Sequence, residues 1–97
     1  MSETAENDLL GIVRYISAQL SAPVTALKMM KTMEDALAGL VHFPHKCPVV
    51  ADERLARTGY RKLMIKNYIA FFTIDEKTET VNIERILYAR RSWRNII

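Results

Sequence analysis

The residues of this chain best suited to chemistry are cationic and aromatic side chains in its C-terminal half. They are Arg61, Lys62, Lys66, Arg85, Tyr88, Arg90, Arg91 and Trp93. Clustered lysine and arginine side chains stabilise negative charge that develops on a phosphate, and an aromatic ring can stack on a displaced base. If the strands that carry these residues are neighbours, the side chains converge on one concave basic surface.

Each of these residues also has a purely structural interpretation. The arginines near the C-terminus can form a solvated tail, and the lysines can protect an exposed strand. Trp93 can close the core with its N–H bonded to a carbonyl. Arg85 can pair with an acid such as Glu34 or Asp35. The functional interpretation therefore depends on the clustering of these side chains.

The charge of the chain is unevenly placed. Lysine and arginine outnumber aspartate and glutamate by 14 to 11, which gives a net charge of +3. The start of the chain is acidic, whereas its end carries Arg90, Arg91 and Arg94 and no acid. A basic end on a weakly basic domain permits binding to phosphate or to an acidic partner without requiring it.

The size and composition of the chain are those of a small globular protein. Its 97 residues predict a single domain, residues 1–97, with one modest core. The acidic, polar start is the opposite of a signal peptide, and no apolar run approaches the length of a membrane span. We therefore expect a cytoplasmic protein that does not engage a membrane.

His42, His45 and Cys47 come closest to a metal-site pattern. Three soft ligands this close together can bind a metal ion, but no fourth ligand is evident and the spacing matches no common structural zinc site. A Cys–His nucleophile on the same residues lacks a third, orienting group. No glycine-rich phosphate loop occurs, so we expect neither a metal nor another cofactor.

Helical periodicity dominates the first part of the chain and predicts helices over residues 4–20 and 22–40. The first helix has one apolar stripe: Leu9, Ile12, Val13, Ile16 and Leu20. Ser21 can cap the second helix, with Pro23 in its first turn. Prolines and a closing glycine mark residues 41–59 as a long connection.

From Tyr60 the apolar period changes to two, which predicts strands over residues 60–66, 68–74 and 81–88, followed by a tail over 89–97. Short polar turns make consecutive strands antiparallel neighbours. The fold class is therefore α+β, with an antiparallel helical hairpin packed on one face of a small sheet of three to four antiparallel strands.

The predicted sheet has two faces, and the helical hairpin accounts for one. Every second residue of a strand points to the same face of the sheet, so we expect one face of the third strand to carry Ile83, Arg85 and Leu87. The second face also carries apolar residues, among them Met64 and Ile86. Either a partner protein or the folded-back C-terminal tail covers that face, and the sequence favours neither.

The succession of elements, with "FP" after the second helix and then "GYRKL", "NYIAFF" and "IERILYARRSW", resembles the RelE/ParE family of bacterial toxins. These plasmid stabilisation proteins belong to type II toxin–antitoxin modules. The resemblance covers nearly the whole chain and is greatest from Gly59 to Trp93. Members of the family usually begin with a strand, whereas this chain starts at "MSETAEND", so we expect that first strand to be absent or nearly so.

The resemblance implies a toxin that arrests growth and is neutralised by an antitoxin whose helix and extended segment wrap it, giving a toxin–antitoxin hetero-oligomer. One implied mechanism is metal-independent, ribosome-dependent cleavage of messenger RNA. The other is poisoning of DNA gyrase without nuclease activity. A third interpretation, an attenuated toxin that only binds its antitoxin, follows from the expected loss of the first strand.

Cleavage of RNA requires activation of the 2′-hydroxyl, stabilisation of the phosphate and protonation of the leaving oxygen. The candidate catalytic residues are Arg61, Lys62, Arg85, Arg90 and Arg91, and the candidates for binding RNA or another target are Lys66, Tyr88 and Trp93. Arg90 or Arg91 matches the C-terminal arginine of the family, and Trp93 or Tyr88 its C-terminal aromatic residue.

The basic cluster and Trp93 favour the first mechanism, whereas the start of the central strand favours the second, so the sequence leaves both open. Ribonuclease members of the family carry an arginine directly after the tyrosine that opens this strand. Here Ile69 follows Tyr68, and "NYIAFF" is more similar to the gyrase-poisoning branch.

Overall fold

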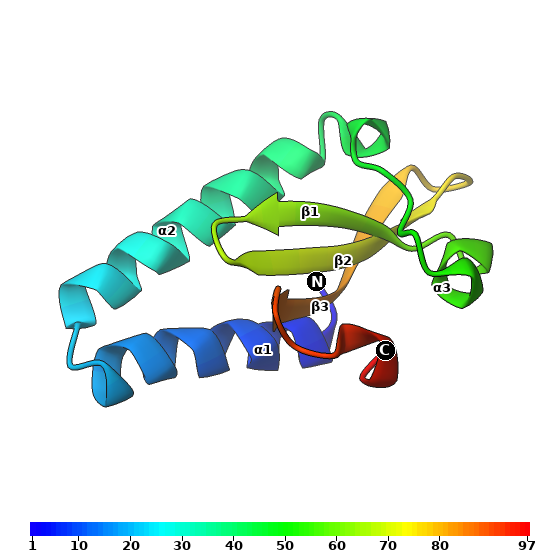
Figure 1. The fold of residues 1–97 in the computed structure, drawn as a ribbon. Coiled ribbons are helices and arrows are strands. Elements are labelled where there is room, and N and C mark those ends of the chain that lie inside the picture. Colours follow the sequence, from blue (N-terminus) through cyan, green and yellow to red (C-terminus); the bar gives the residue numbers. More distant parts are fainter.

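The computed structural model describes residues 1–97, except for the side chain of Arg94, which lies outside the described residues. The helices are α1 (Glu3–Arg14), α2 (Pro23–Leu40) and the short α3 (Glu53–Arg57); a π-helical turn, Tyr15–Gln19, follows α1, and 3₁₀ turns span Pro44–Lys46 and Trp93–Asn95. The strands are β1 (Arg61–Ile65), β2 (Tyr68–Asp75) and β3 (Thr80–Tyr88). The α+β fold class is confirmed (Figure 1).

The start of α1 is fixed by Ser2, which joins the helix to the sheet. The Ser2 hydroxyl oxygen accepts a hydrogen bond from the Ala5 N–H at 3.0 Å, as expected of an N-cap, and the hydroxyl donates to the Glu84 carbonyl at 2.9 Å. The Ser2 N–H also donates to the Ile83 carbonyl at 2.8 Å. The residue that caps α1 therefore also bonds to the outer edge of β3.

The strands form one antiparallel sheet in the order β1-β2-β3. Lys66 and Asn67 make the two-residue turn between β1 and β2, and Lys66 has a positive φ of 55°. Hairpin turns this short need positive φ, usually supplied by glycine or asparagine. The hairpin positions the start of β2 next to the end of β3.

A β-bulge changes which residues of β3 share a face. Phe71 pairs with Arg85, but Phe72 pairs with Ile83, so Glu84 is the extra residue. The expectation that Ile83, Arg85 and Leu87 alternate on one face is therefore wrong. Ile83 packs into the core beneath the helices, whereas Leu87 packs on the opposite side of the sheet.

The helical hairpin covers one face of the sheet, with α1 along β3 and α2 against β1 (Figure 1). Met33 and Leu37 of α2 and Ala5 of α1 meet Phe72 and Ile86 in this core. Burial of such side chains contributes roughly 1.5–3 kcal/mol each for the larger ones.

The second face of the sheet is covered by the chain itself. Val50, Leu55, Ile69, Phe71 and Leu87 form a second buried cluster, against which Trp93, Ile96 and Ile97 of the C-terminal tail pack. Of the two alternatives that the sequence leaves open, the structure therefore has the folded-back tail.

Candidate functional site

The predicted site residues fall into three groups, and the first lies on the tail-covered face of the sheet. Lys62 pairs with Phe71, which pairs with Arg85, so these side chains form one cross-strand row. The ring of Trp93 packs on Phe71, with centroids 5.1 Å apart. Lys62, Arg85 and Trp93 are thus brought to one face.

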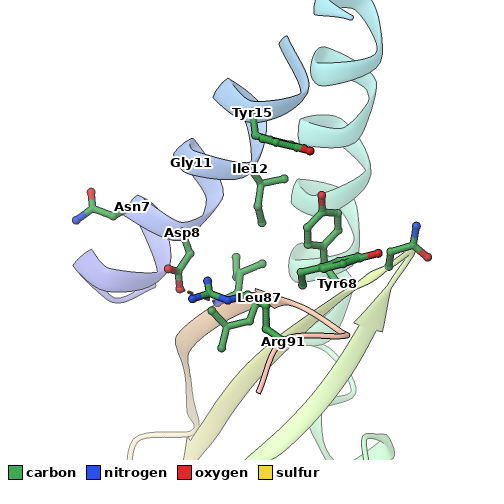
Figure 2. A pocket seen from close by; sticks show the side chains of 11 residues that line it. Asn7, Asp8, Gly11, Ile12, Tyr15, Tyr68, Leu87 and Arg91 are labelled. Atoms are coloured by element: carbon green, nitrogen blue, oxygen red, sulfur yellow. Dashed lines mark hydrogen bonds between the residues drawn. The ribbon is translucent and has the colours of Figure 1, made fainter. Parts of the chain in front are cut away.

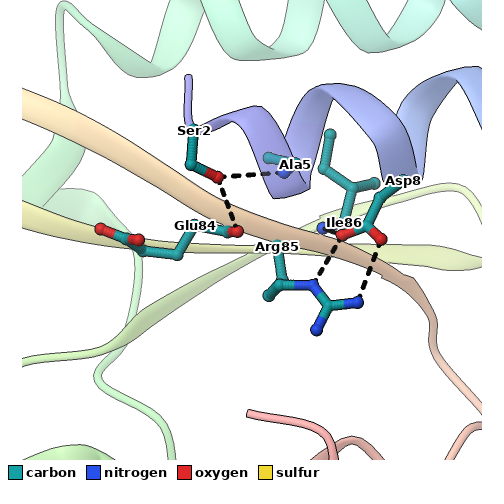
Figure 3. Close-up of polar contacts among 6 residues, drawn as sticks. All are labelled: Ser2, Ala5, Asp8, Glu84, Arg85 and Ile86. Carbon is teal, nitrogen blue, oxygen red and sulfur yellow. Dashed lines mark hydrogen bonds and ion pairs between the residues drawn. The ribbon is translucent and has the colours of Figure 1, made fainter.

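Arg85 of this group is already engaged by an acid. Its Nε and Nη2 donate to the two carboxylate oxygens of Asp8 at 2.8 and 3.0 Å (Figure 3). Asp8 also accepts the Ile86 N–H at 3.0 Å. The predicted pairing of Arg85 with Glu34 or Asp35 is wrong, because α1 rather than α2 runs along β3.

The environment of Arg85 stabilises the protonated, positively charged form of its side chain. The hydrogen bonds that Arg85 donates to Asp8 raise the pKa of Arg85; partial burial opposes the rise, and the charge of the Asp8 carboxylate adds to it. The side chains of Arg85 and Asp8 are 23% and 15% exposed, so the pair is mostly shielded from water. A bidentate pair of this kind fixes the guanidinium in place.

Arg61 forms the second group, on the opposite face of the sheet. It pairs with Phe72, whose side chain lies in the core beneath the helices. Its Nη1 donates to the Cys47 carbonyl at 2.7 Å and so ties β1 to the preceding loop. The sheet therefore separates Arg61 from Lys62 and Arg85.

The third group gathers where the β1–β2 turn meets the end of β3. The Ala89 N–H donates to the Asn67 carbonyl at 2.8 Å, and the Arg91 N–H donates to the Tyr88 carbonyl at 3.0 Å. These bonds place Lys66 next to Tyr88, Arg90 and Arg91, and all four residues are exposed. These members of the predicted set are therefore gathered at one end of the sheet.

A pocket of about 660 Å³ opens next to this third group, between α1 and the adjoining ends of β2 and β3 (Figure 2). Its lining combines aromatic, amide and charged side chains: Asn7, Asp8, Gly11, Ile12, Tyr15, Asn67, Tyr68, Ile86, Leu87, Tyr88 and Arg91. Tyr88 and Arg91 were predicted as site residues. The others were not, because no local pattern shows that α1 passes beside the end of β3.

Tyrosine side chains form the most distinctive part of this pocket. The rings of Tyr68 and Tyr88 are 5.7 Å apart between centroids and tilted by 55°. Burial raises the pKa of Tyr68, with smaller contributions from Tyr88 and Tyr15. The Tyr68 hydroxyl is therefore neutral at physiological pH and can donate a hydrogen bond.

The histidine and cysteine residues of the long loop do not form a metal site. Within the described residues, no group of at least three histidine, cysteine or acidic side chains is arranged to hold a metal ion. His45 Nε2 lies 3.1 Å from a carboxylate oxygen of Glu76. Burial raises the pKa of Cys47, with Arg61 opposing the rise, so the thiol is protonated at neutral pH and a poor nucleophile.

Comparisons with known proteins assign the chain to a family. A family model described as "ParE toxin of type II toxin-antitoxin system, parDE" matches residues 1–93. A comparison with curated proteins finds no match. Among the described residues, no helix is long and apolar enough to cross a membrane. Because the family model spans nearly all of the chain, the protein belongs to the ParE family of type II toxin–antitoxin toxins.

Proposed function

We propose that this toxin arrests growth in the cytoplasm by binding and inhibiting DNA gyrase, without cleaving RNA, and that its antitoxin relieves the arrest by binding the toxin. The observation that carries this proposal is the bidentate capture of Arg85 by Asp8. A guanidinium held this way has fewer donors left for a transferring phosphate. The family assignment and the Tyr68-Ile69 sequence at the start of β2 support the same conclusion.

The arrangement of the remaining cations also favours binding over cleavage. Cleavage without a metal requires several groups converging on one phosphate. Here Arg61 lies on the far face, and Trp93 packs on Phe71. Binding to a protein surface does not require several groups to converge on one phosphate. The exposed arginines after β3 are suited to contact an acidic partner.

The ribonuclease mechanism remains the second candidate, since Lys62 and Arg85 share one face across Phe71. The two mechanisms are distinguished by inducing the toxin and measuring DNA supercoiling and messenger RNA integrity in the same culture. Gyrase inhibition predicts lost supercoiling or trapped gyrase–DNA breaks with intact messages. Ribosome-dependent message cleavage with normal supercoiling would overturn the proposal.

A growth assay tests the third interpretation, the attenuated toxin. If induction of the chain, or of a form extended at its N-terminus, has no effect on growth while the antitoxin still binds, the chain has kept only its antitoxin-binding role. Co-expression with the antitoxin is the control, because it should restore growth under the proposed function.

A further inference from the structure

The charge around the pocket between α1 and β3 favours an anionic ligand. Arg91 lines the pocket, and among the described side chains it makes no ion pair. Lys66 and Arg90 are exposed on the adjoining turns, which the Ala89–Asn67 hydrogen bond holds together. Among the described residues that line the pocket, the one acid is Asp8, and Arg85 neutralises it. A negatively charged group entering the pocket therefore meets an unopposed guanidinium.

The aromatic lining provides ring faces for a planar group. Tyr15 is 54% exposed and Tyr88 is 40% exposed, so both rings remain accessible. Tyr15 begins the π-helical turn, in which the Leu20 N–H bonds to the Tyr15 carbonyl at 3.2 Å. Single π turns in helices often occur at functional sites. Figure 2 shows Tyr15, in the π-helical turn that continues α1, above the pocket and Tyr68 on β2 below it.

The pocket also offers polar groups that can pair with the edge of a ring. In an antiparallel sheet, alternate residues of an edge strand point their N–H and C=O groups outward. Ile86 points its N–H outward, where Asp8 already accepts it, so by the same alternation the Tyr88 N–H also points outward; the Tyr88 carbonyl already accepts the Arg91 N–H. The side-chain amides of Asn7 and Asn67 line the same space and carry both donors and acceptors.

Gly11 keeps the α1 wall of the pocket open. A Cβ atom added at Gly11 would meet no heavy atom within 4 Å, and this residue lines the pocket. A volume of about 660 Å³ lies within the range of about 300–1,000 Å³ that is typical of small-molecule sites.

From this combination we propose that the pocket binds one nucleotide unit, with the base against the tyrosine rings and the phosphate on Arg91. Ring stacking together with a guanidinium contact is the chemistry by which proteins hold unpaired nucleotides. The nucleotide is either free in solution or part of a single strand. Its occupancy does not depend on gyrase inhibition.

The test is direct binding of nucleotides to the purified full chain by calorimetry. The probes are AMP, GMP, CMP and UMP, with short single-stranded RNA and DNA oligonucleotides as a second arm. Similar affinities for a mononucleotide and an oligonucleotide identify a free nucleotide as the ligand. Tighter binding of the oligonucleotide identifies a strand. No binding in either arm at millimolar concentrations overturns the proposal.

The glycines of the two long helices provide a matched pair of variants. Gly11→Leu fills the pocket, whereas Gly39→Leu adds the same side chain on α2, where a Cβ also meets no atom within 4 Å. Loss of one stacked base weakens binding by about tenfold or more. We expect that loss in Gly11→Leu and unchanged affinity in Gly39→Leu. Equal affinity of Gly11→Leu and the unmodified chain contradicts the assignment.

The role of Arg91 is tested by comparing AMP with adenosine. Loss of a charge-assisted hydrogen bond weakens binding by about tenfold or more. Arg91→Gln should therefore lower the affinity for AMP and leave the affinity for adenosine unchanged. If both affinities fall equally, Arg91 does not bind the phosphate. Because these measurements contain no gyrase, their failure is distinguishable from failure of the proposed gyrase inhibition.

Discussion

Replacement of Asp8 by alanine is the most informative test of how α1 is held on the sheet. The Asp8 carboxylate accepts three hydrogen bonds, two from the Arg85 guanidinium and one from the Ile86 N–H (Figure 3). Asp8→Ala removes all three acceptors at once. The substitution leaves two groups without their acceptor: the Arg85 guanidinium, whose side chain is only 23% exposed, and the Ile86 N–H at the edge of the sheet.

The expected loss of stability can be estimated from these contacts. Removing one partner of a buried ion pair destabilises a protein by about 3–5 kcal/mol, and each hydrogen bond to a charged group contributes about 1.5–3 kcal/mol. Residual exposure of Arg85 lets water solvate part of the freed charge, so we expect about 3 kcal/mol. For a domain of this size that corresponds to a fall in Tm of about 12–24 °C.

Thermal or urea unfolding of the purified variants measures this loss. The matched control is Asp35→Ala, because Asp35 makes an exposed pair with Lys31 and should contribute less than about 1 kcal/mol. A double-mutant cycle with Arg85→Leu isolates the pair. If Asp8→Ala costs no more than Asp35→Ala, the Asp8 contacts do not hold α1 on β3 and our account of this region is wrong.

Trp93→Ala should lower the stability by about 3 kcal/mol, the lower end of the range for a buried tryptophan, because the ring packs on Phe71 but is only partly buried; an unchanged urea midpoint would show that the tail is dispensable. Arg90→Ala combined with Arg91→Ala should abolish toxicity in a growth assay while the melting transition stays cooperative, and loss of that transition would show a structural role instead. Lys66→Gly should raise stability by about 0.5–1 kcal/mol in urea, since glycine adopts a φ of 55° without strain; a decrease would contradict this. Burial raises the pKa of Tyr68 above its ordinary value of 10.0. The neutral Tyr68 ring therefore contributes its full stabilisation below pH 10.0, and the free energy of unfolding falls as the pH rises above that value and the hydroxyl ionises. A Tyr68→Phe variant with the same alkaline fall in stability would argue against it.

The sequence by itself indicated the two long helices, the three strands and the family, but not the π-helical turn after α1. The 3.6-residue period before residue 40 and the period of two after Tyr60 follow from local backbone geometry, so they are visible without a structure. The placement of Pro23 in the first turn of α2 is local in the same sense, but the predicted Ser21 cap is wrong, because Ala22 is the N-cap residue and no side chain caps this helix. These features, together with the matching segments, were sufficient to identify an α+β toxin fold.

Only the tertiary structure decided which side chains meet. Asp8 and Arg85 are far apart in sequence, and any of several acids was a plausible partner until α1 was placed along β3. The bulge at Glu84 then moved Arg85 to the opposite face from Ile83, a change that a strict period of two does not predict. The sequence also did not show that the C-terminal tail covers the second face of the sheet, because that contact depends on how the two segments pack.

The pocket illustrates the same limit. Tyr15, Tyr68 and Tyr88 belong to three elements, and no spacing in the sequence relates them. The path of α1 past the end of β3 brings them together, and that path results from burial of the apolar face of α1. Local patterns are fixed by the geometry of one segment, whereas a site between segments depends on how their buried surfaces fit.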